Sequence, residues 1–395
     1  MHLVKFLTIG LIFSLVLGEF GHYPFGGATF AIRLTDVLLS LTLGFLAVWQ
    51  IGIKKKILLP KEFILIIIFW LIGFLSLIYA ANFKGFFYLL RFILYSLAFW
   101  LSYSLVKTKT LSFQKLLSLM VFSGVILALL GIFQLIVYPD FESLTLFGFD
   151  PHKYRLASTF LDPNFLGAFL NIILLFSFYL LQKRPTKIFF LVNLILLISI
   201  ILTNSRSALL MLFVQILLLG IFKNKYLIIL LISLAVLIYF FVPAAAERVY
   251  NGLTIDESAG ERFKSWGNGL YIFKQNPIFG VGFDNLREAL EKNNLVKVYS
   301  DNGGHAGAGI DSAFVFLLAT TGIVGLLAYF SFWFFLVRNI LTKDFTKDYL
   351  PLISLTLIIS LFIDTQFINS LFYTPIMLII YLFFGGISGL KDQEE

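Results

Sequence analysis

The sequence predicts an all-α polytopic membrane protein, and three observations carry this prediction. Of its 395 residues, 59% are hydrophobic and 13% are charged, and the mean hydropathy is +0.93. The apolar residues form repeated continuous runs of about 20 residues, which is the length of helix that crosses the apolar core of a bilayer. These runs are continuous, whereas transmembrane β-strands alternate, and a helix satisfies its own backbone groups in lipid.

Twelve such runs are predicted to be transmembrane helices. The first follows Lys5 and resembles a signal peptide, but no convincing cleavage site follows near Gly18, so we interpret it as a retained helix. The predicted spans are 3–20, 33–52, 60–80, 86–106, 114–137, 160–182, 187–204, 206–222, 226–242, 311–337, 349–365 and 371–390.

Basic residues gather in alternate connections between these spans, and the positive-inside rule places those connections in the cytoplasm. Both termini then lie in the cytoplasm, and the loops 21–32, 81–85, 138–159, 243–310 and 366–370 face outward. The basic connections hold Lys54–Lys56, Lys107, Lys109, Lys183, Arg184, Lys187, Lys223, Lys225, Arg338, Lys343 and Lys347. The chain therefore divides into helices 1–9 (1–242), a large outer loop (243–310), and helices 10–12 with a tail (311–395).

Composition also limits the chemistry. The chain has no cysteine, which excludes disulfides and thiolate metal sites. The formal charge of +8 is explained by the cytoplasmic connections, so it does not indicate a nucleic-acid partner. His22, His152 and His305 are scattered, and no pair has metal-ligand spacing, so we expect no metal.

The outer loop is predicted to contain two helices. Trp266, Leu270 and Phe273 fall on one face of an amphipathic helix near 259–276. Pro277 ends this helix, a Gly-rich turn follows, and a second helix is expected at about 284–293.

Two arginines on the outer side could bind an anion. Arg206 opens a span, and its guanidinium matches phosphate oxygens in a bidentate way; the alternative is that it only extends toward the membrane interface. Arg262 lies early in the amphipathic loop helix, and the alternative there is a solvated pair with Glu257 or Glu261.

Other polar residues have local interpretations. Asp162-Pro163-Asn164 is typical of a helix start, with Arg155 just before it. His305 could act as a general base, and Asp311 could act as a base or cap the following helix. Arg33 and Asp36 are three residues apart, so they share a helix face and can pair.

These polar motifs resemble the O-antigen ligase and polymerase family of bacterial membrane glycosyltransferases. The family pattern has a Ser-Arg pair opening a span, Pro-Asn before a span, an outer loop with Arg, Trp, Asn/His-Pro and Gly-x-Gly, and a late Gly-x-x-Gly. The matching residues are Ser205-Arg206, Pro163-Asn164, Arg262, Trp266, Asn276-Pro277, Gly280-Val281-Gly282 and 311–327. The resemblance covers most of the chain in topology and about 150–335 in motif. It departs at Asp311-Ser312, where many ligases have His-Asn.

The resemblance implies a GT-C-like enzyme of lipopolysaccharide biosynthesis in the bacterial inner membrane, with its active site on the periplasmic face. It implies transfer of a glycan from undecaprenyl pyrophosphate to a sugar hydroxyl, in contact with membrane lipids and without a metal or other cofactor. The acceptor is lipid A-core for a ligase, or another lipid-linked repeat for a polymerase.

The residues that match the family take their roles from the resemblance. Pyrophosphate binding falls to Arg206, Arg262 and Arg155, with Trp266 and Asn164 supporting the site. The base is His305 or Asp311, or no dedicated base is used.

The presence of a His in the outer loop favours a ligase over a polymerase. A flippase or other transporter would need charges through the bundle centre and two related halves, which the sequence does not show clearly. A purely structural membrane component would not need the large basic and aromatic outer loop.

Overall fold

The computed structural model describes residues 1–25, 30–147, 149–229, 232–233, 257–295, 309–341 and 348–394. Most of them are helical. The elements are α1 (His2–Ser14), η1 (Leu15–Gly21), β1 (His22–Phe25), β2 (Phe30–Arg33), α2 (Leu34–Ala47), η2 (Val48–Ile53), α3 (Phe63–Tyr79), α4 (Phe86–Ser96), α5 (Ala98–Lys107), α6 (Phe113–Val137), η3 (Glu142–Phe147), η4 (Ser158–Phe160), α7 (Pro163–Lys183), α8 (Lys187–Leu202), α9 (Arg206–Phe222), α12 (Glu257–Gln275), α13 (Leu286–Lys292), α14 (Ala313–Leu341), α15 (Tyr349–Asp364), η5 (Ser370–Phe372) and α16 (Thr374–Glu394).

The chain is a multi-pass membrane protein. Within the described ranges, seven helices are long and apolar enough to cross a membrane: His2–Gly21, Leu34–Ile53, Phe86–Lys107, Phe113–Val137, Pro163–Lys183, Ala313–Leu341 and Thr374–Gln393. Four shorter apolar helices are α3, α8, α9 and α15. The span predicted at 226–242 lies mostly outside the described residues, so the total of twelve stays a prediction.

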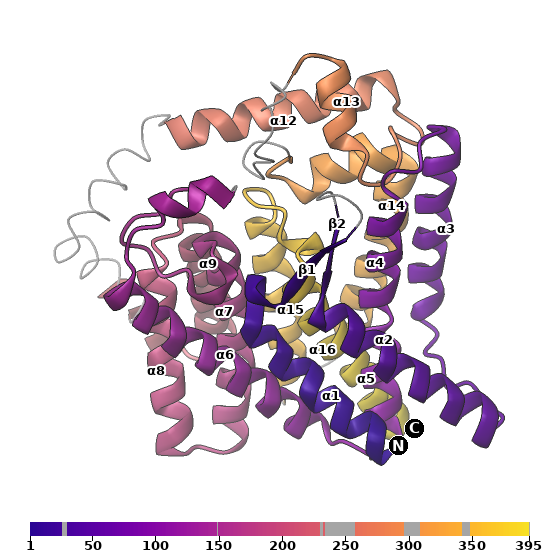
Figure 1. Ribbon diagram of the computed structural model, residues 1–395. Coiled ribbons are helices and arrows are strands. Elements are labelled where there is room, and N and C mark those ends of the chain that lie inside the picture. Colours follow the sequence, from indigo (N-terminus) through magenta and orange to yellow (C-terminus); the bar gives the residue numbers. More distant parts are fainter. Residues whose placement is uncertain are drawn as a thin grey trace.

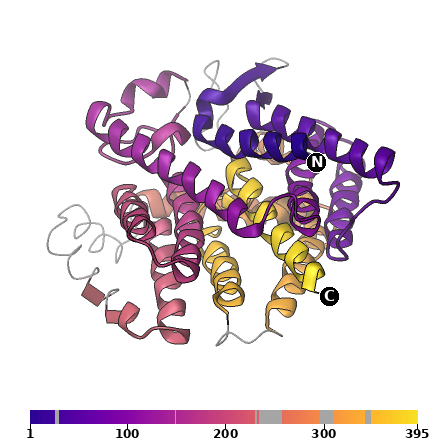
Figure 2. The same cartoon turned by 90° about the horizontal axis from the view of Figure 1, so that it is seen from below.

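α16 forms the centre of the bundle. It packs along α5, while α15 packs on α9 and α14 on α3. Its residues from Ile376 to Phe384 are all at most 3% exposed. Figure 2 shows α15 and α16 between the group that contains α6–α8 and the group that contains α3–α5. Side chains on the outside of the bundle, such as Phe6 and Phe133, are large, apolar and exposed, as expected of surfaces that face lipid.

The predicted start of α7 is confirmed, because its signal is local. The Asp162 carboxylate accepts hydrogen bonds from the backbone N–H groups of Asn164 (2.6 Å) and Phe165 (3.3 Å), and Pro163 is the first helical residue. A proline costs nothing there, because the first N–H groups of a helix have no intrahelical partner. Ser205 caps α9 in the same way, through the backbone N–H of Ala208.

The first loop that was predicted to face outward, 21–32, contains structure that the sequence analysis missed. β1 and β2 form an antiparallel hairpin in which His22 pairs with Arg33 and Tyr23 with Ile32. In Figure 1 the hairpin is seen near the middle of the view, in front of α15 and α16.

The second polar region is α12 and α13. They lie across one end of the bundle, and both termini lie at the opposite end (Figure 1). The two predicted loop helices are thus present, but the buried face of α12 differs from the prediction. Leu270 is 41% exposed, whereas Ile272 is buried and Gly269 faces Ile310 and Val315. Gly269 was missed because apolar periodicity does not identify a glycine as a contact residue.

The span predicted at 311–337 corresponds to α14, but the helix is broken at Gly322, which the sequence analysis did not predict. The backbone there leaves the helical region (φ 67°, ψ −170°). The segment after α12 fills the break: the Ile323 N–H donates to Pro277 O (2.9 Å), and the Val281 N–H donates to Ala319 O (3.0 Å). A helix within a membrane can break only where other groups satisfy the freed backbone, and this inserted segment does so.

Candidate functional site

Arg155 joins the start of α7 to the turn before α9. Its Nε donates to the backbone oxygen of Thr203 (3.0 Å), and its Nη2 donates to the side-chain oxygen of Asn164 (2.9 Å). The Leu156 N–H also donates to Leu202 O (3.0 Å). Two segments that the sequence analysis treated separately are therefore held together by the guanidinium of Arg155.

Arg206 is the first residue of α9, two residues beyond this turn. It is partly exposed, and its neighbours Ser205 and Ser207 are buried. The N-terminus of a 17-residue helix presents unsatisfied N–H groups and a partial positive charge, which favour an anion. Arg206 adds a full positive charge at this helix end.

Arg262, on α12, faces carboxyl groups from three other elements. Burial raises the pKa of Asp162 and of Asp311, and the positive charge of Arg262 opposes that rise in both. The charge of Arg262 also reaches Asp364, the last residue of α15, which lies beside Ser207. α12 therefore brings a cation to the place where the ends of α7, α9, α14 and α15 meet.

Asp311 does not cap α14, contrary to one expectation from the sequence. The cap is Ser312, whose hydroxyl accepts from the Val315 N–H (3.4 Å). The backbone N–H of Asp311 donates to the Ser265 hydroxyl (3.1 Å), which ties this residue to α12 one turn from Arg262. Its carboxyl group is thus left beside the charges of Arg262, Asp150 and Asp162.

The remaining predicted residues have different outcomes. Trp266 packs against Phe263 and Phe367, with ring centroids 5.4 and 6.2 Å away. Its indole N–H is buried and has no hydrogen-bond partner among the described residues. His305 lies outside the described residues.

Asp364, the last residue of α15, has no role in the sequence analysis. It is 0% exposed, and the hydroxyl groups of Ser207 and Ser370 lie beside its carboxylate. An ionisable residue at the end of an apolar span was the available signal, since such residues are costly in a membrane unless they serve a function.

The structure also brings together two carboxylates and a histidine that could bind a metal, a group that the sequence analysis did not identify. Ligand atoms of Asp150, His152 and Asp162 lie within 4.8 Å of one another. Burial, assisted by Arg155, lowers the pKa of His152 to about 4, so its imidazole is neutral at pH 7. Arg155 Nη1 is 3.4 Å from His152 Nδ1, so a cation already lies next to the group. The sequence analysis considered only the spacing of the histidines and so did not include these carboxylates. The expectation that no metal binds stays a prediction.

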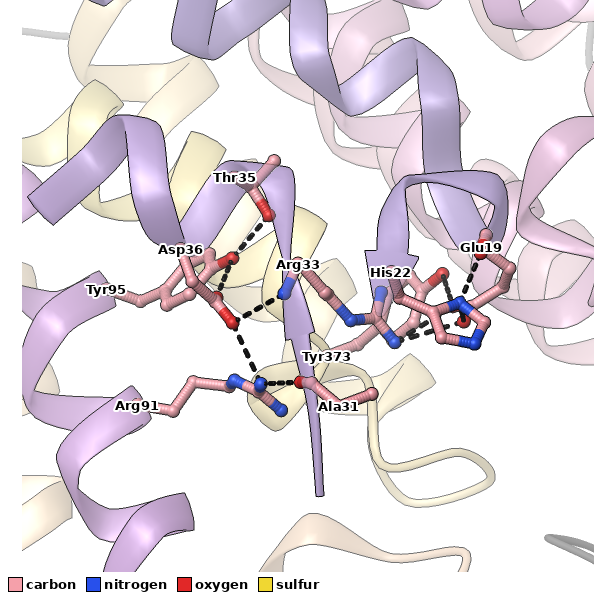
Figure 3. Close-up of polar contacts among 9 residues, drawn as sticks. All are labelled: Glu19, His22, Ala31, Arg33, Thr35, Asp36, Arg91, Tyr95 and Tyr373. Atoms are coloured by element: carbon pink, nitrogen blue, oxygen red, sulfur yellow. Dashed lines mark hydrogen bonds and ion pairs between the residues drawn. The ribbon is translucent and has the colours of Figure 1, made fainter. Parts of the chain in front are cut away.

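A second cluster of charges lies beside the hairpin (Figure 3), and it overturns the predicted Arg33–Asp36 side-chain pair. The Arg33 guanidinium pairs with Glu19 (2.9 Å), and Asp36 pairs with Arg91 (2.8 Å). Arg33 is an extended residue before α2 (φ −97°, ψ 150°), so only its backbone N–H reaches Asp36 (3.0 Å). The prediction failed because it assumed that both residues were helical.

Comparison with known families matches residues 191–330, which run from α8 to the middle of α14. The model that matches this segment is that of the O-antigen ligase family. The O-antigen ligase segment is about a third of the chain and contains Arg206, Arg262 and Asp311. Arg155 and Asp162 precede it, and Asp364 follows it. Comparison with curated proteins gave no match.

Proposed function

We propose that the chain transfers a glycan from undecaprenyl pyrophosphate to an acceptor sugar hydroxyl at the periplasmic face, as an O-antigen ligase with lipid A-core as acceptor. The main support is that Arg206 and Arg262 both lie in the O-antigen ligase segment. The charge of Arg262 also extends to Asp364, beside the first turn of the helix that Arg206 opens.

The reaction breaks the bond between the anomeric carbon of the glycan and a pyrophosphate oxygen. Undecaprenyl pyrophosphate leaves, and the acceptor oxygen forms the new glycosidic bond. Negative charge develops on the leaving pyrophosphate, and Arg206, Arg262 and Arg155 stabilise it by charge-assisted hydrogen bonds. In this proposal no metal is needed for that task.

The acceptor hydroxyl loses its proton as the new bond forms. Asp311 is one candidate base, since burial raises its pKa and a carboxylate with a raised pKa takes a proton more readily near neutral pH. His305 is the other candidate, and the third possibility is that no dedicated base is used. Parallel Asp311→Asn and His305→Gln variants separate these cases, because only the base should change the pH profile of transfer.

The site would face the periplasm and both termini the cytoplasm. Support comes from the basic connections and from α12, which lies at the end of the bundle opposite to both termini (Figure 1). Because the chain has no cysteine, one cysteine placed at exposed Tyr271 on α12 reports its side of the membrane. Labelling by an impermeant thiol reagent from outside is expected, and labelling only from the cytoplasmic side would contradict this orientation.

Deletion of the gene in its native host, followed by a gel of surface glycans, tests the reaction. Loss of all attached chains is expected of a ligase. Attached glycans limited to a single repeat would indicate a repeat-unit polymerase, the alternative that Asp311-Ser312 favours in place of His-Asn. An unchanged glycan pattern would contradict both, and accumulation of lipid-linked glycan on the cytoplasmic side would indicate a flippase.

A further inference from the structure

A cavity of about 250 Å³ lies between α4, α7, α14 and the start of α16, beneath the segment that joins α12 to α13. Water occupies about 30 Å³ per molecule in the liquid, so the cavity holds a group much larger than a single water. Seven of its twelve lining residues are aromatic. The faces of aromatic rings carry partial negative charge and attract the C–H groups of a flat, weakly polar ligand.

Two polar groups in this aromatic wall are oxygen acceptors. The carboxylate of Asp284 lines the cavity together with Arg91, and burial raises its pKa to about 7 although the charge of Arg91 opposes that rise. The side-chain oxygen of Asn369 is buried and accepts no hydrogen bond within the described residues. Buried acceptors are nearly always satisfied in folded proteins, so the oxygen of Asn369 indicates a ligand that donates hydrogen bonds.

Asp284 is held rigidly in an uncommon backbone conformation. Its φ is +58°, in the left-handed region that few non-glycine residues adopt. On one side, the Phe283 N–H donates to the Ser76 hydroxyl (3.0 Å). On the other, the Asn285 side chain accepts from the Gly85 N–H (2.8 Å) and donates to Asn82 O (2.8 Å). These contacts on both sides fix the position of the Asp284 backbone at the cavity.

The cavity shares a wall with the arginine site. Phe165 lines it and follows Asn164, the residue that accepts from Arg155. The ring of Phe165 stacks on Tyr373, another lining residue, with centroids 4.2 Å apart. A group in the cavity would therefore lie next to the start of α7, which Arg155 joins to the turn before α9.

We propose that this cavity is a binding subsite for one sugar ring of the glycan substrate, with Asp284 and Asn369 accepting hydrogen bonds from its hydroxyl groups. Sugars combine apolar C–H faces with hydroxyl donors around the edge, which matches an aromatic wall with isolated oxygen acceptors. The proposal rests on the proposed function, since the glycan is the substrate of that same site.

The first test uses the cysteine-free chain. Thr374 lines the cavity and is 8% exposed, so Thr374→Cys places a single thiol there. The full-length variant in detergent is labelled with N-ethylmaleimide, with and without the host oligosaccharide released from its lipid carrier by mild acid. The matched control is Tyr271→Cys, which is on α12 away from the cavity.

Labelling of Thr374→Cys should slow about fivefold when the oligosaccharide is present at about four times its Kd, while Tyr271→Cys is unchanged. Because the released oligosaccharide carries no pyrophosphate, protection reports sugar binding alone and does not require transfer. Equal labelling rates with and without the oligosaccharide would overturn the subsite.

The second test measures transfer, so that the subsite stays testable if Thr374→Cys fails to fold. Asp284→Asn keeps the side-chain volume, and asparagine tolerates a left-handed backbone conformation. Its KM for the donor glycan or for the acceptor glycan should rise about tenfold, since a hydrogen bond to a charged acceptor is lost. Which KM rises identifies the glycan bound. The control Glu291→Gln on α13 should change neither.

The two failures are distinguishable. A wild-type chain that transfers no glycan would contradict the proposed function. A wild-type chain that transfers glycan, with both KM values unchanged in Asp284→Asn, would contradict the subsite alone.

Discussion

Two charge clusters, one beside the hairpin and one beneath α12, use the same residue types in different ways. Beside the hairpin, both carboxylates have direct arginine partners, Glu19 with Arg33 and Asp36 with Arg91 (Figure 3). Beneath α12, Arg262 faces several carboxyl groups at once, and Asp364 is buried beside two serine hydroxyl groups. The first cluster is internally satisfied and is suited to holding the fold together. The second brings a cation from α12 to the ends of several helices, which suits it to binding an anion.

Disrupting the cluster beside the hairpin should have the largest effect, and that effect should be on the stability of the fold. Asp36→Ala leaves the buried Arg91 guanidinium without its carboxylate and removes the acceptor of the Tyr95 hydroxyl. Loss of one partner of a buried pair costs about 3–5 kcal/mol. Thermal unfolding in detergent measures this change.

The control for that prediction is an exposed pair. Arg287 and Glu291 form one on α13, and Glu291→Ala should cost less than about 1 kcal/mol. Similar losses in both variants would show that the cluster beside the hairpin is not a special support of the fold.

Breaking the cluster beneath α12 should affect activity instead. Arg262→Ala and Arg206→Ala should each lower glycan transfer about 100- to 1,000-fold, which is typical when a donor that stabilises developing charge is removed. The unfolding temperature should stay close to that of the wild type.

A lysine substitution sharpens this result. Arg262→Lys retains the charge but loses the bidentate geometry, so it should restore only part of the activity. Lys264→Ala, at an exposed position two residues further along α12, should be neutral. Full activity in both alanine variants would refute pyrophosphate binding by these arginines.

The titration of Asp284 is expected to have a smaller effect, which is on how stability depends on pH. The folded carboxyl group has a pKa of about 7, against an ordinary value of 3.8, so the folded chain binds more protons than the unfolded chain between these values. Stability should therefore fall as the pH rises from about 4 to about 7. Between about pH 4 and about pH 7, the unfolding temperature of the wild type should fall relative to that of Asp284→Asn, and parallel curves would contradict the raised pKa.

The smallest expected effect is that of a chelator. Arg155 already supplies positive charge beside Asp150, His152 and Asp162, so EDTA should leave the transfer rate unchanged. Loss of activity that Mg²⁺ or Mn²⁺ restores, and that Asp150→Asn abolishes, would instead identify the group as a metal site.

Features that depend on near neighbours in the sequence could be predicted. The spans follow from runs of apolar residues, and the Asp162 cap follows from three consecutive residues. The O-antigen ligase segment lies within the region whose motifs carried the resemblance. Lipid imposes strong local constraints on the chain, which is why these predictions succeeded.

Features that depend on distant contacts could not be predicted. The partners of Arg33 and Asp36 are 14 and 55 residues away in the sequence. The left-handed conformation of Asp284 depends on Ser76, Asn82 and Gly85, which a separate part of the chain contributes. The break in α14 follows from the segment inserted at Gly322, because nothing in an apolar run shows that another segment will enter it.

That inserted segment has a consequence for assembly during synthesis. Residues 277–281 are made before α14, yet their hydrogen bonds to Ala319 and Ile323 can form only after α14 has entered the membrane. Until then, the freed backbone groups at Gly322 lack these partners, which favours a continuous helix. The break therefore forms late, as a docking step after insertion. A chain halted before that step would carry Arg262 on α12 before residues 277–281 have docked on α14.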